Sequence, residues 1–143
     1  MTTDRSENLI ALERCWDAQS AYVGSGGEDF AAMAASLHPE IVLRQADSLP
    51  YGGEWRGHRG IEGWMKEMTR AWDSVEVEHS ALFEHDDSIV VLATFEARAR
   101  ATGTRVRMPI CEVIRFADSL PLEWRVFYLD TAAINRVLGA VAA

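Results

Sequence analysis

Glu112 is the residue whose setting most strongly suggests chemistry. It stands in a stretch whose alternate positions are otherwise apolar: Val106, Met108, Ile110, Ile114 and Phe116. If Thr102 and Gly103 form a two-residue hairpin turn, the preceding strand places Ala93 opposite Glu112. A carboxyl group on an apolar face must be protonated, paired or hydrogen-bonded. We therefore expect Glu112 to be a catalytic acid or base, or else a structural residue that binds a Trp, Tyr or Arg side chain.

Two further catalytic candidates depend on the next hairpin. A turn centred on Asp118 and Ser119 sets Arg125 beside Glu112 as its ion partner. Asp130 then points away unless a bulge intervenes, and bulges are common near functional sites. Asp130 is also a good N-cap for a helix that begins at Thr131. We expect a catalytic set of Glu112, Arg125 and Asp130, with capping as the alternative role of Asp130.

Candidate substrate-binding residues come from the loop at residues 47–60 and from the apolar faces of the expected elements. Long loops in compact domains often bind ligands. Core packing is the alternative for the helical and strand residues, and outward packing is the alternative for the loop aromatics. The candidates are Trp16, Tyr22, Gln45, Tyr51, Trp55, Trp64, Met68, Phe95, Ile110, Phe127 and Tyr128.

Composition limits the functions that the chain can have. With 143 residues, 48% of them hydrophobic, we expect one domain over residues 1–143. The net charge of −8 argues against nucleic-acid and anionic-membrane partners. No signal sequence or membrane-spanning run is present, so we expect a soluble, cytoplasmic protein. Cys15 and Cys111 are expected to be buried free thiols, and no motif indicates a metal or cofactor.

The hydrophobic period changes from helical to alternating near residue 72. Ser6 is the expected N-cap of a first helix that ends at the glycines of residues 24–27. Helices that precede an antiparallel meander indicate an α+β fold. The expected helices cover residues 30–37 and 61–72, with a last one from Thr131, and the strands cover residues 41–45, 75–83, 89–100, 105–116 and 122–130.

Two segments resemble a known family. The sequence LPYGGEWRG at residues 49–57 and the sequence FYLDTAA at residues 127–133 are similar to the SnoaL-like branch of the nuclear transport factor 2-like superfamily. The resemblance covers roughly Leu9 to Leu138. It implies a cone-shaped α+β barrel, with N-terminal helices packed on the concave face of a curved antiparallel sheet, a pocket open at one end and a homodimer.

The resemblance also implies a range of functions. Members include ketosteroid isomerases, polyketide cyclases, scytalone dehydratases, limonene epoxide hydrolases and binders without known chemistry. We therefore expect a cofactor-free acid–base enzyme that acts on a small apolar or amphipathic molecule such as a polyketide, steroid or terpenoid. The alternatives are a non-catalytic module that binds a hydrophobic ligand and a dimer-forming accessory domain. An isomerase's Asp base with its Tyr/Asp pair has no counterpart here, and Glu112, Arg125 and Asp130 only loosely match the epoxide hydrolase set.

Overall fold

The computed structural model describes residues 5–139. In that part of the chain, four helices accompany a single sheet of six strands, so the expected α+β class is confirmed. The helices are α1 (Glu7–Gly24), α2 (Ala31–Ala35), α3 (Gly57–Ala71) and α4 (Thr131–Leu138). The strands are β1 (Val42–Gln45), β2 (Gly53–Arg56), β3 (Trp72–His85), β4 (Ser88–Ala99), β5 (Arg105–Ala117) and β6 (Leu120–Tyr128).

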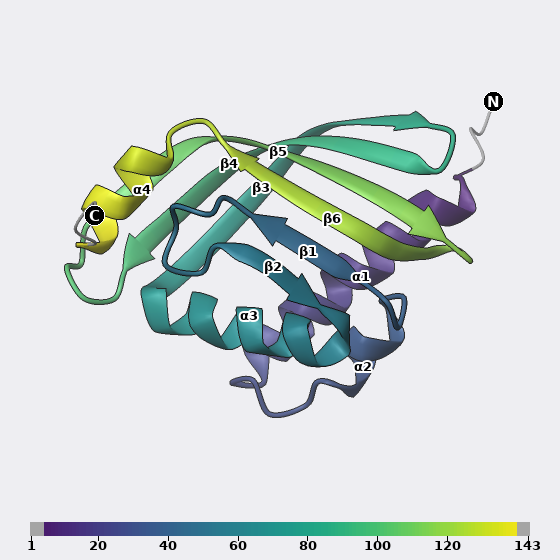
Figure 1. Cartoon of the computed structure of the whole chain (residues 1–143), viewed down its shortest axis with the longest axis horizontal. Helices are drawn as coiled ribbons and strands as arrows, with labels where there is room; N and C mark the ends of the chain where they lie inside the picture. The colour runs from purple at the N-terminus through teal and green to yellow at the C-terminus, as the bar shows by residue number, and fades with distance from the viewer. Residues whose placement is uncertain (1–4, 140–143) are drawn as a thin grey trace.

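The sheet is curved and does not close on itself. Its strand order is β2-β1-β6-β5-β4-β3, and every neighbouring pair is antiparallel except β1 with β6, which is parallel. Figure 1 shows the sheet arching over α1 and α3, with α4 at one end. This is the expected cone shape, with the N-terminal helices against the concave face of the sheet.

Local signals place the ends of two helices. The Ser6 hydroxyl accepts a hydrogen bond from the backbone N–H of Leu9 at 3.0 Å and so caps α1. The Asp130 carboxylate accepts one from the N–H of Ala133 at 3.1 Å and so caps α4. Of the helices that the structure describes, none has the length and apolar character needed to cross a bilayer.

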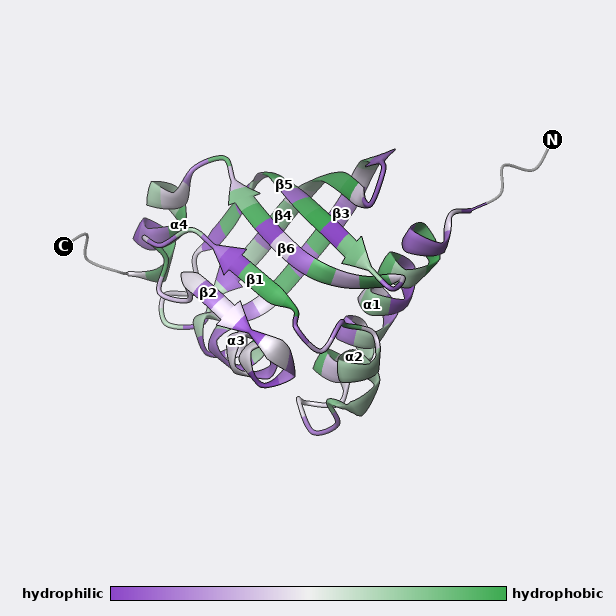
Figure 2. Ribbon diagram, turned by 45° about the vertical axis from the view of Figure 1, so that its right-hand side comes forward, coloured by the Kyte–Doolittle hydropathy of each residue, from purple (hydrophilic) through white to green (hydrophobic). Residues whose placement is uncertain are grey.

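The concave face of β4 and β5 is buried along its length. Its members are Ile89, Val91, Ala93, Phe95, Ala97 and Ala99 on β4, and Val106, Met108, Ile110, Glu112, Ile114 and Phe116 on β5. Hydrophobic and hydrophilic residues alternate along these strands (Figure 2). The predicted membership of this face, including Glu112, is therefore confirmed.

The predicted register between β4 and β5 is wrong by two residues. Val91, not Ala93, lies opposite Glu112. The connecting loop is longer than a two-residue turn because the N–H of Gly103, at a φ of 72°, bonds back to the carbonyl of Ala99 at 2.8 Å. A slip of two residues leaves every side chain on the same side of the sheet. The predicted set of residues on the concave face is therefore correct although the register is not.

The predicted register between β5 and β6 is wrong by one residue, which has a larger effect. The turn at Asp118 and Ser119 forms as expected, with positive φ at both residues. A bulge next to Arg115 then shifts the pairing. As a result Trp124 and Val126 point inward with Glu112, which pairs with Val126.

The loop at residues 47–60 is more ordered than expected. Its second half forms β2, which pairs with β1, and α3 already begins at Gly57. Gly53, the first residue of β2, pairs with Gln45 and has a φ of 92°, a conformation that glycine adopts readily. Trp72, expected as the last helical residue, is instead the extended and buried first residue of β3.

Candidate acid–base and ligand site

Glu112 lies inside the cone with a single side-chain hydrogen bond among the residues that the structure describes. It is 7% exposed, and its Oε1 accepts a bond from the Trp124 indole Nε1–H at 3.2 Å. Burial raises the pKa of Glu112 to about 7, although the bond from Trp124 opposes the shift. The carboxyl group is therefore poised between its two protonation states near neutral pH.

Arg125 is not the partner of Glu112. The bulge turns Arg125 to the convex face, where its Nε lies 3.8 Å from Glu123 and its guanidinium stands 5.9 Å from the centre of the Phe127 ring. Phe127 is exposed on the same face. Asp130 is exposed and caps α4. The structure therefore brings neither Arg125 nor Asp130 to Glu112.

Gln45 and Tyr128 share the concave face with Glu112. Gln45 follows Arg44, which pairs with Arg125, so Gln45 lies beside Val126 at the end of β1. Val126 separates Gln45 from Glu112, and adjacent strands lie about 4.8 Å apart, which sets these two backbones about 10 Å apart. Tyr128 is the next inward residue of β6. Three polar side chains thus surround Val126 on an apolar surface.

A chain of hydrogen bonds leads from Trp72 through Tyr51 to Tyr128. The Trp72 Nε1–H donates to the Tyr51 hydroxyl at 3.3 Å, and the Tyr51 hydroxyl donates to the Tyr128 hydroxyl at 3.3 Å. Burial raises the pKa of Tyr51, and it raises that of Tyr128 well above its ordinary value. Both phenols therefore stay protonated and act as neutral hydrogen-bonding groups at physiological pH.

Two buried polar atoms in the cone have no hydrogen-bond partner. They are the Oε1 of Gln45, a residue that is 5% exposed, and the Nε1 of Trp64. The Trp64 ring packs edge to face on Trp124, with ring centres 5.9 Å apart. Buried polar groups normally have partners, because an unpaired one costs about 1–3 kcal/mol. One free acceptor and one free donor thus face the interior that holds Glu112.

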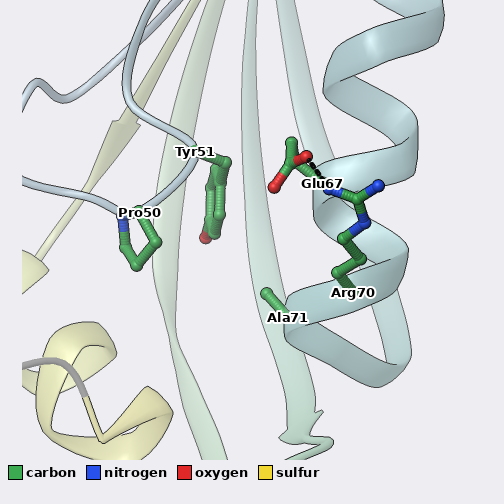
Figure 3. Close-up of a pocket in the computed structure, with 5 residues that line it drawn as sticks. All are labelled: Pro50, Tyr51, Glu67, Arg70 and Ala71. Atoms are coloured by element: carbon green, nitrogen blue, oxygen red, sulfur yellow. Dashed lines mark hydrogen bonds and ion pairs between the residues drawn. The ribbon is translucent and has the colours of Figure 1, made fainter.

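A hollow of about 190 Å³ opens next to this cluster. It is lined by Pro50, Tyr51, Glu67, Arg70 and Ala71. Figure 3 shows the Tyr51 ring standing between Pro50 and the α3 residues Glu67 and Arg70, whose side chains pair at 2.6 Å. Tyr51 borders the hollow with its ring and reaches Tyr128 with its hydroxyl, so it separates the hollow from the polar groups inside. Glu112 does not line this hollow.

A second hollow of about 290 Å³ lies at the start of α1. Its lining consists of Glu7, Ile10, Ala11, Arg14 and Ser119. The Ser119 hydroxyl donates to the Glu7 carboxylate at 3.0 Å across it. No site candidate from the sequence borders this hollow.

The other candidate binding residues form the walls of the cone or lie outside it. Phe95 packs edge to face on both Trp72 and Tyr128, and Ile110 is buried beside them. Met68 packs against the same core. Trp55 donates to the backbone carbonyl of Tyr51 at 3.0 Å, with its ring beside Gly63 of α3. Trp55 therefore holds the loop that carries Tyr51.

Trp16 and Tyr22 lie along α1, away from the Tyr51 cluster. The Trp16 ring stacks on His79 of β3 at 3.7 Å between centres. Tyr22 packs edge to face on Phe30, and its hydroxyl lies near Gly27. Both residues are parts of the α1 packing surface.

Sequence reasoning missed Trp124 and Trp72, the two indoles that hold the polar groups in place. A signal for Trp124 was present, because Leu122, Trp124, Val126 and Tyr128 alternate with Glu123 and Arg125. That alternation indicates an inward Trp124, whereas counting residues back from the turn put Arg125 inside. Trp72 gave no such signal, since it continues the helical spacing of α3.

The cysteines and the metal-binding residue types add no further chemistry to the site. Burial raises the pKa of the Cys15 thiol to about 11, so Cys15 is unreactive at neutral pH, and Cys111 is only half-buried. Within residues 5–139, no three His, Cys, Asp or Glu side chains are grouped as metal ligands would be.

Comparison with known proteins places the chain among SnoaL-like domains. The family model described as a SnoaL-like domain matches residues 18–123, which is most of the chain. No curated protein matches the chain in sequence.

Solved structures share the fold at low sequence identity. A nuclear transport factor 2-like protein of unknown function from Burkholderia pseudomallei is 20% identical, with a TM-score of 0.81 over 95% of this chain and 100% of that one. TerC, crystallised with polyporic acid, is 19% identical, with a TM-score of 0.78 over 94% of this chain and 100% of that one. A putative SnoaL-like polyketide cyclase from Jannaschia sp. CCS1 is 15% identical, with a TM-score of 0.75 over 98% of this chain and 100% of that one. These likenesses establish a cone fold of the nuclear transport factor 2-like type.

Proposed function

Because the chain belongs to the SnoaL-like domain family, we propose that it binds a small, mostly apolar molecule and transforms it by cofactor-free acid–base catalysis at Glu112. The observation that carries the proposal is the buried Glu112 carboxyl group, whose pKa burial raises to about 7. General acid–base catalysis is most effective when the catalytic pKa lies near the working pH. Strong pKa shifts of this kind cluster at functional sites.

The surrounding residues supply the other parts of such a site. Glu112 takes up or releases the proton, and Trp124 holds one carboxylate oxygen and so orients the group. Tyr128 is a neutral donor that stabilises a substrate oxygen on which negative charge develops, and Tyr51 in turn donates to Tyr128. Isomerisation, aldol-type cyclisation, dehydration and epoxide opening all fit this arrangement. TerC with polyporic acid and the cyclase-like neighbour support a polyketide or similar ring compound as the substrate class.

Access to the site runs past Tyr51. The hollow bordered by Tyr51 is the one that adjoins the interior polar cluster. A ligand that enters there displaces the Tyr51 ring and reaches Tyr128, Gln45 and then Glu112. Trp55 stabilises the loop from which Tyr51 projects.

A second candidate function is non-catalytic binding of a hydrophobic ligand. The bond from Trp124 favours it, because a carboxyl group held by an indole N–H also has a purely structural explanation. In this case the protein retains the ligand without changing it, and binding does not depend on the protonation state of Glu112.

Hydrogen–deuterium exchange separates the two functions. We expect the protein to accelerate exchange of the α-hydrogens of 1-tetralone in D₂O, measured by mass spectrometry. Glu112→Gln should reduce the acceleration by about 10²-fold or more. Glu96→Gln, a change on the convex face of β4, is the matched control and should keep it. Binding of the ketone without exchange identifies the non-catalytic function, and exchange that survives Glu112→Gln excludes Glu112 as the catalytic group.

We also propose that two copies associate through the convex face of the sheet. Leu92, Cys111 and Phe127 form a row across β4, β5 and β6, and both Leu92 and Phe127 are exposed. Light scattering during gel filtration should show a dimer that Leu92→Glu converts to a monomer. Ile10→Glu, at an equally exposed apolar residue of α1, should leave the dimer intact. A monomeric wild-type protein would contradict this proposal.

A further inference from the structure

Two hydrogen bonds link Trp72 to Tyr128 through the Tyr51 hydroxyl. An indole N–H can only donate, so the Tyr51 oxygen accepts from Trp72 at 3.3 Å. The Tyr51 proton is then available for the Tyr128 oxygen, which it approaches at 3.3 Å. Tyr128 is therefore an acceptor at the end of a chain that begins at Trp72.

Gln45 lies on the same concave face as Tyr128, one strand away. Its Oε1 is buried without a hydrogen-bond partner, and the strand pairing places it beside Val126, the inward residue that precedes Tyr128 on β6. The Tyr128 oxygen accepts from Tyr51, and among residues 5–139 no acceptor takes the Tyr128 proton, so this proton is available for a further acceptor. An unpartnered acceptor, Gln45 Oε1, and an available donor, the Tyr128 hydroxyl, consequently belong to neighbouring side chains.

We propose that Gln45 Oε1 and the Tyr128 hydroxyl form a subsite for an uncharged hydroxyl group of the ligand. The ligand hydroxyl donates to Gln45 Oε1 and accepts from Tyr128. This inference rests on the proposed function, because it requires a ligand within the cone, and it adds a requirement: the ligand carries a hydrogen-bond donor and not only a carbonyl oxygen.

Other oxygen groups satisfy the pair incompletely. An ether or a ketone accepts from Tyr128 but leaves Gln45 Oε1 buried and unpaired. A carboxylate likewise has no proton to donate to Gln45, and in residues 5–139 no buried cation balances its charge. Sites built around a substrate hydroxyl reject analogues that lack it far more strongly than apolar pockets reject a change in size.

Matched probes test the subsite without knowledge of the natural ligand. Calorimetric titration at pH 6 compares 2-naphthol with 2-methoxynaphthalene, which has the same ring system and oxygen but no proton on that oxygen. We expect the wild-type protein to bind 2-naphthol at least tenfold more tightly. In Gln45→Met, which keeps the side-chain length and removes the acceptor, the preference should fall below about threefold. Tyr128→Phe should weaken both probes and retain the preference.

The outcomes distinguish this subsite from the proposed function. Equal binding of the two probes by the wild-type protein overturns the subsite and leaves the pocket in place. An unchanged preference in Gln45→Met also overturns it. Failure of both probes to bind counts against the subsite and the proposed function together. Because the wild-type comparison needs no variant, the test remains decisive even if Gln45→Met does not fold.

Discussion

The two faces of β4 and β5 give a carboxylate opposite surroundings, with water and cations on one face and apolar side chains on the other. On the convex face, Glu96 lies 3.8 Å from Arg107, and Arg98 pairs with Asp73 of β3, all within reach of water. On the concave face, Glu112 has one indole N–H and an apolar surround. The same two strands supply both settings by pointing alternate residues to opposite sides.

This difference explains why no arginine of the convex face is an ion partner of Glu112. Water and nearby cations keep an exposed carboxylate charged, whereas burial without a cation favours the protonated form. Since the sheet separates Glu112 from Arg125 and its neighbours, burial dominates and raises the pKa of Glu112 to about 7. A surface ion pair stabilises the protein little, but a lone buried carboxyl can exchange protons at neutral pH.

The largest expected effect comes from a second carboxyl group on the concave face. Val91 is fully buried directly opposite Glu112. Val91→Asp should destabilise the protein by on the order of 4 kcal/mol at pH 7, because a charge is buried without a partner and beside a like group. Urea unfolding measures the loss. Val90→Asp, one residue along and on the convex face, should cost about 1 kcal/mol or less, and equal losses would mean that the two faces do not differ as described.

The next effect is a pH dependence of stability that belongs to Glu112. The unfolded chain ionises this group near pH 4.5, whereas the folded protein keeps the proton until about pH 7. Its contribution to folding is thus fully present below pH 4.5 and declines by about 3 kcal/mol as the pH rises to 7 and above. Glu112→Gln should remove this decline, so the variant gains stability relative to the wild type at pH 8 but not at pH 4. Glu123→Gln on the convex face is the control, and a parallel pH profile of Glu112→Gln and wild type would disprove the assignment.

A smaller effect isolates the Trp124 hydrogen bond. Trp124→Phe removes the N–H that holds Glu112 Oε1 and should raise the pKa of Glu112 further, at a cost of about 1–2 kcal/mol above neutral pH. Carbon-13 NMR of the glutamate carboxyl group follows the titration. Trp64→Phe is the matched control, because its N–H has no partner to lose. A lower pKa of Glu112 in Trp124→Phe would show that the indole does not stabilise the ionised form.

The smallest expected effect is that of Arg125→Ala. Arg125 is exposed on the convex face beside Glu123, so its loss should change stability by less than about 0.5 kcal/mol and leave the titration of Glu112 unchanged. The same NMR titration and urea unfolding measure both quantities. A clear rise in the Glu112 pKa would restore Arg125 as its ion partner and invalidate the bulged register.

The sequence by itself was enough for the fold class and for the facing of β4 and β5. Alternation along a strand is a property of the local backbone, so it holds whatever the register is. The error of two residues in the β4–β5 hairpin therefore left Glu112 on the concave face, opposite Val91 instead of Ala93. The caps at Ser6 and Asp130 are equally local, since each uses an N–H three residues ahead.

Tertiary structure alone decided which groups surround Glu112. The bulge beside Arg115 inserts one residue, and one residue is enough to exchange Arg125 for Trp124 inside the cone. The position of the bulge reflects the packing of Trp124 on Trp64 of α3 and against Glu112. These contacts join segments that lie far apart in the chain. Long-range packing also brings together the cluster of Tyr51, Trp72, Tyr128 and Gln45. Local patterns fix which way a residue faces within a strand, whereas long-range packing selects the register and so the partners that each residue meets.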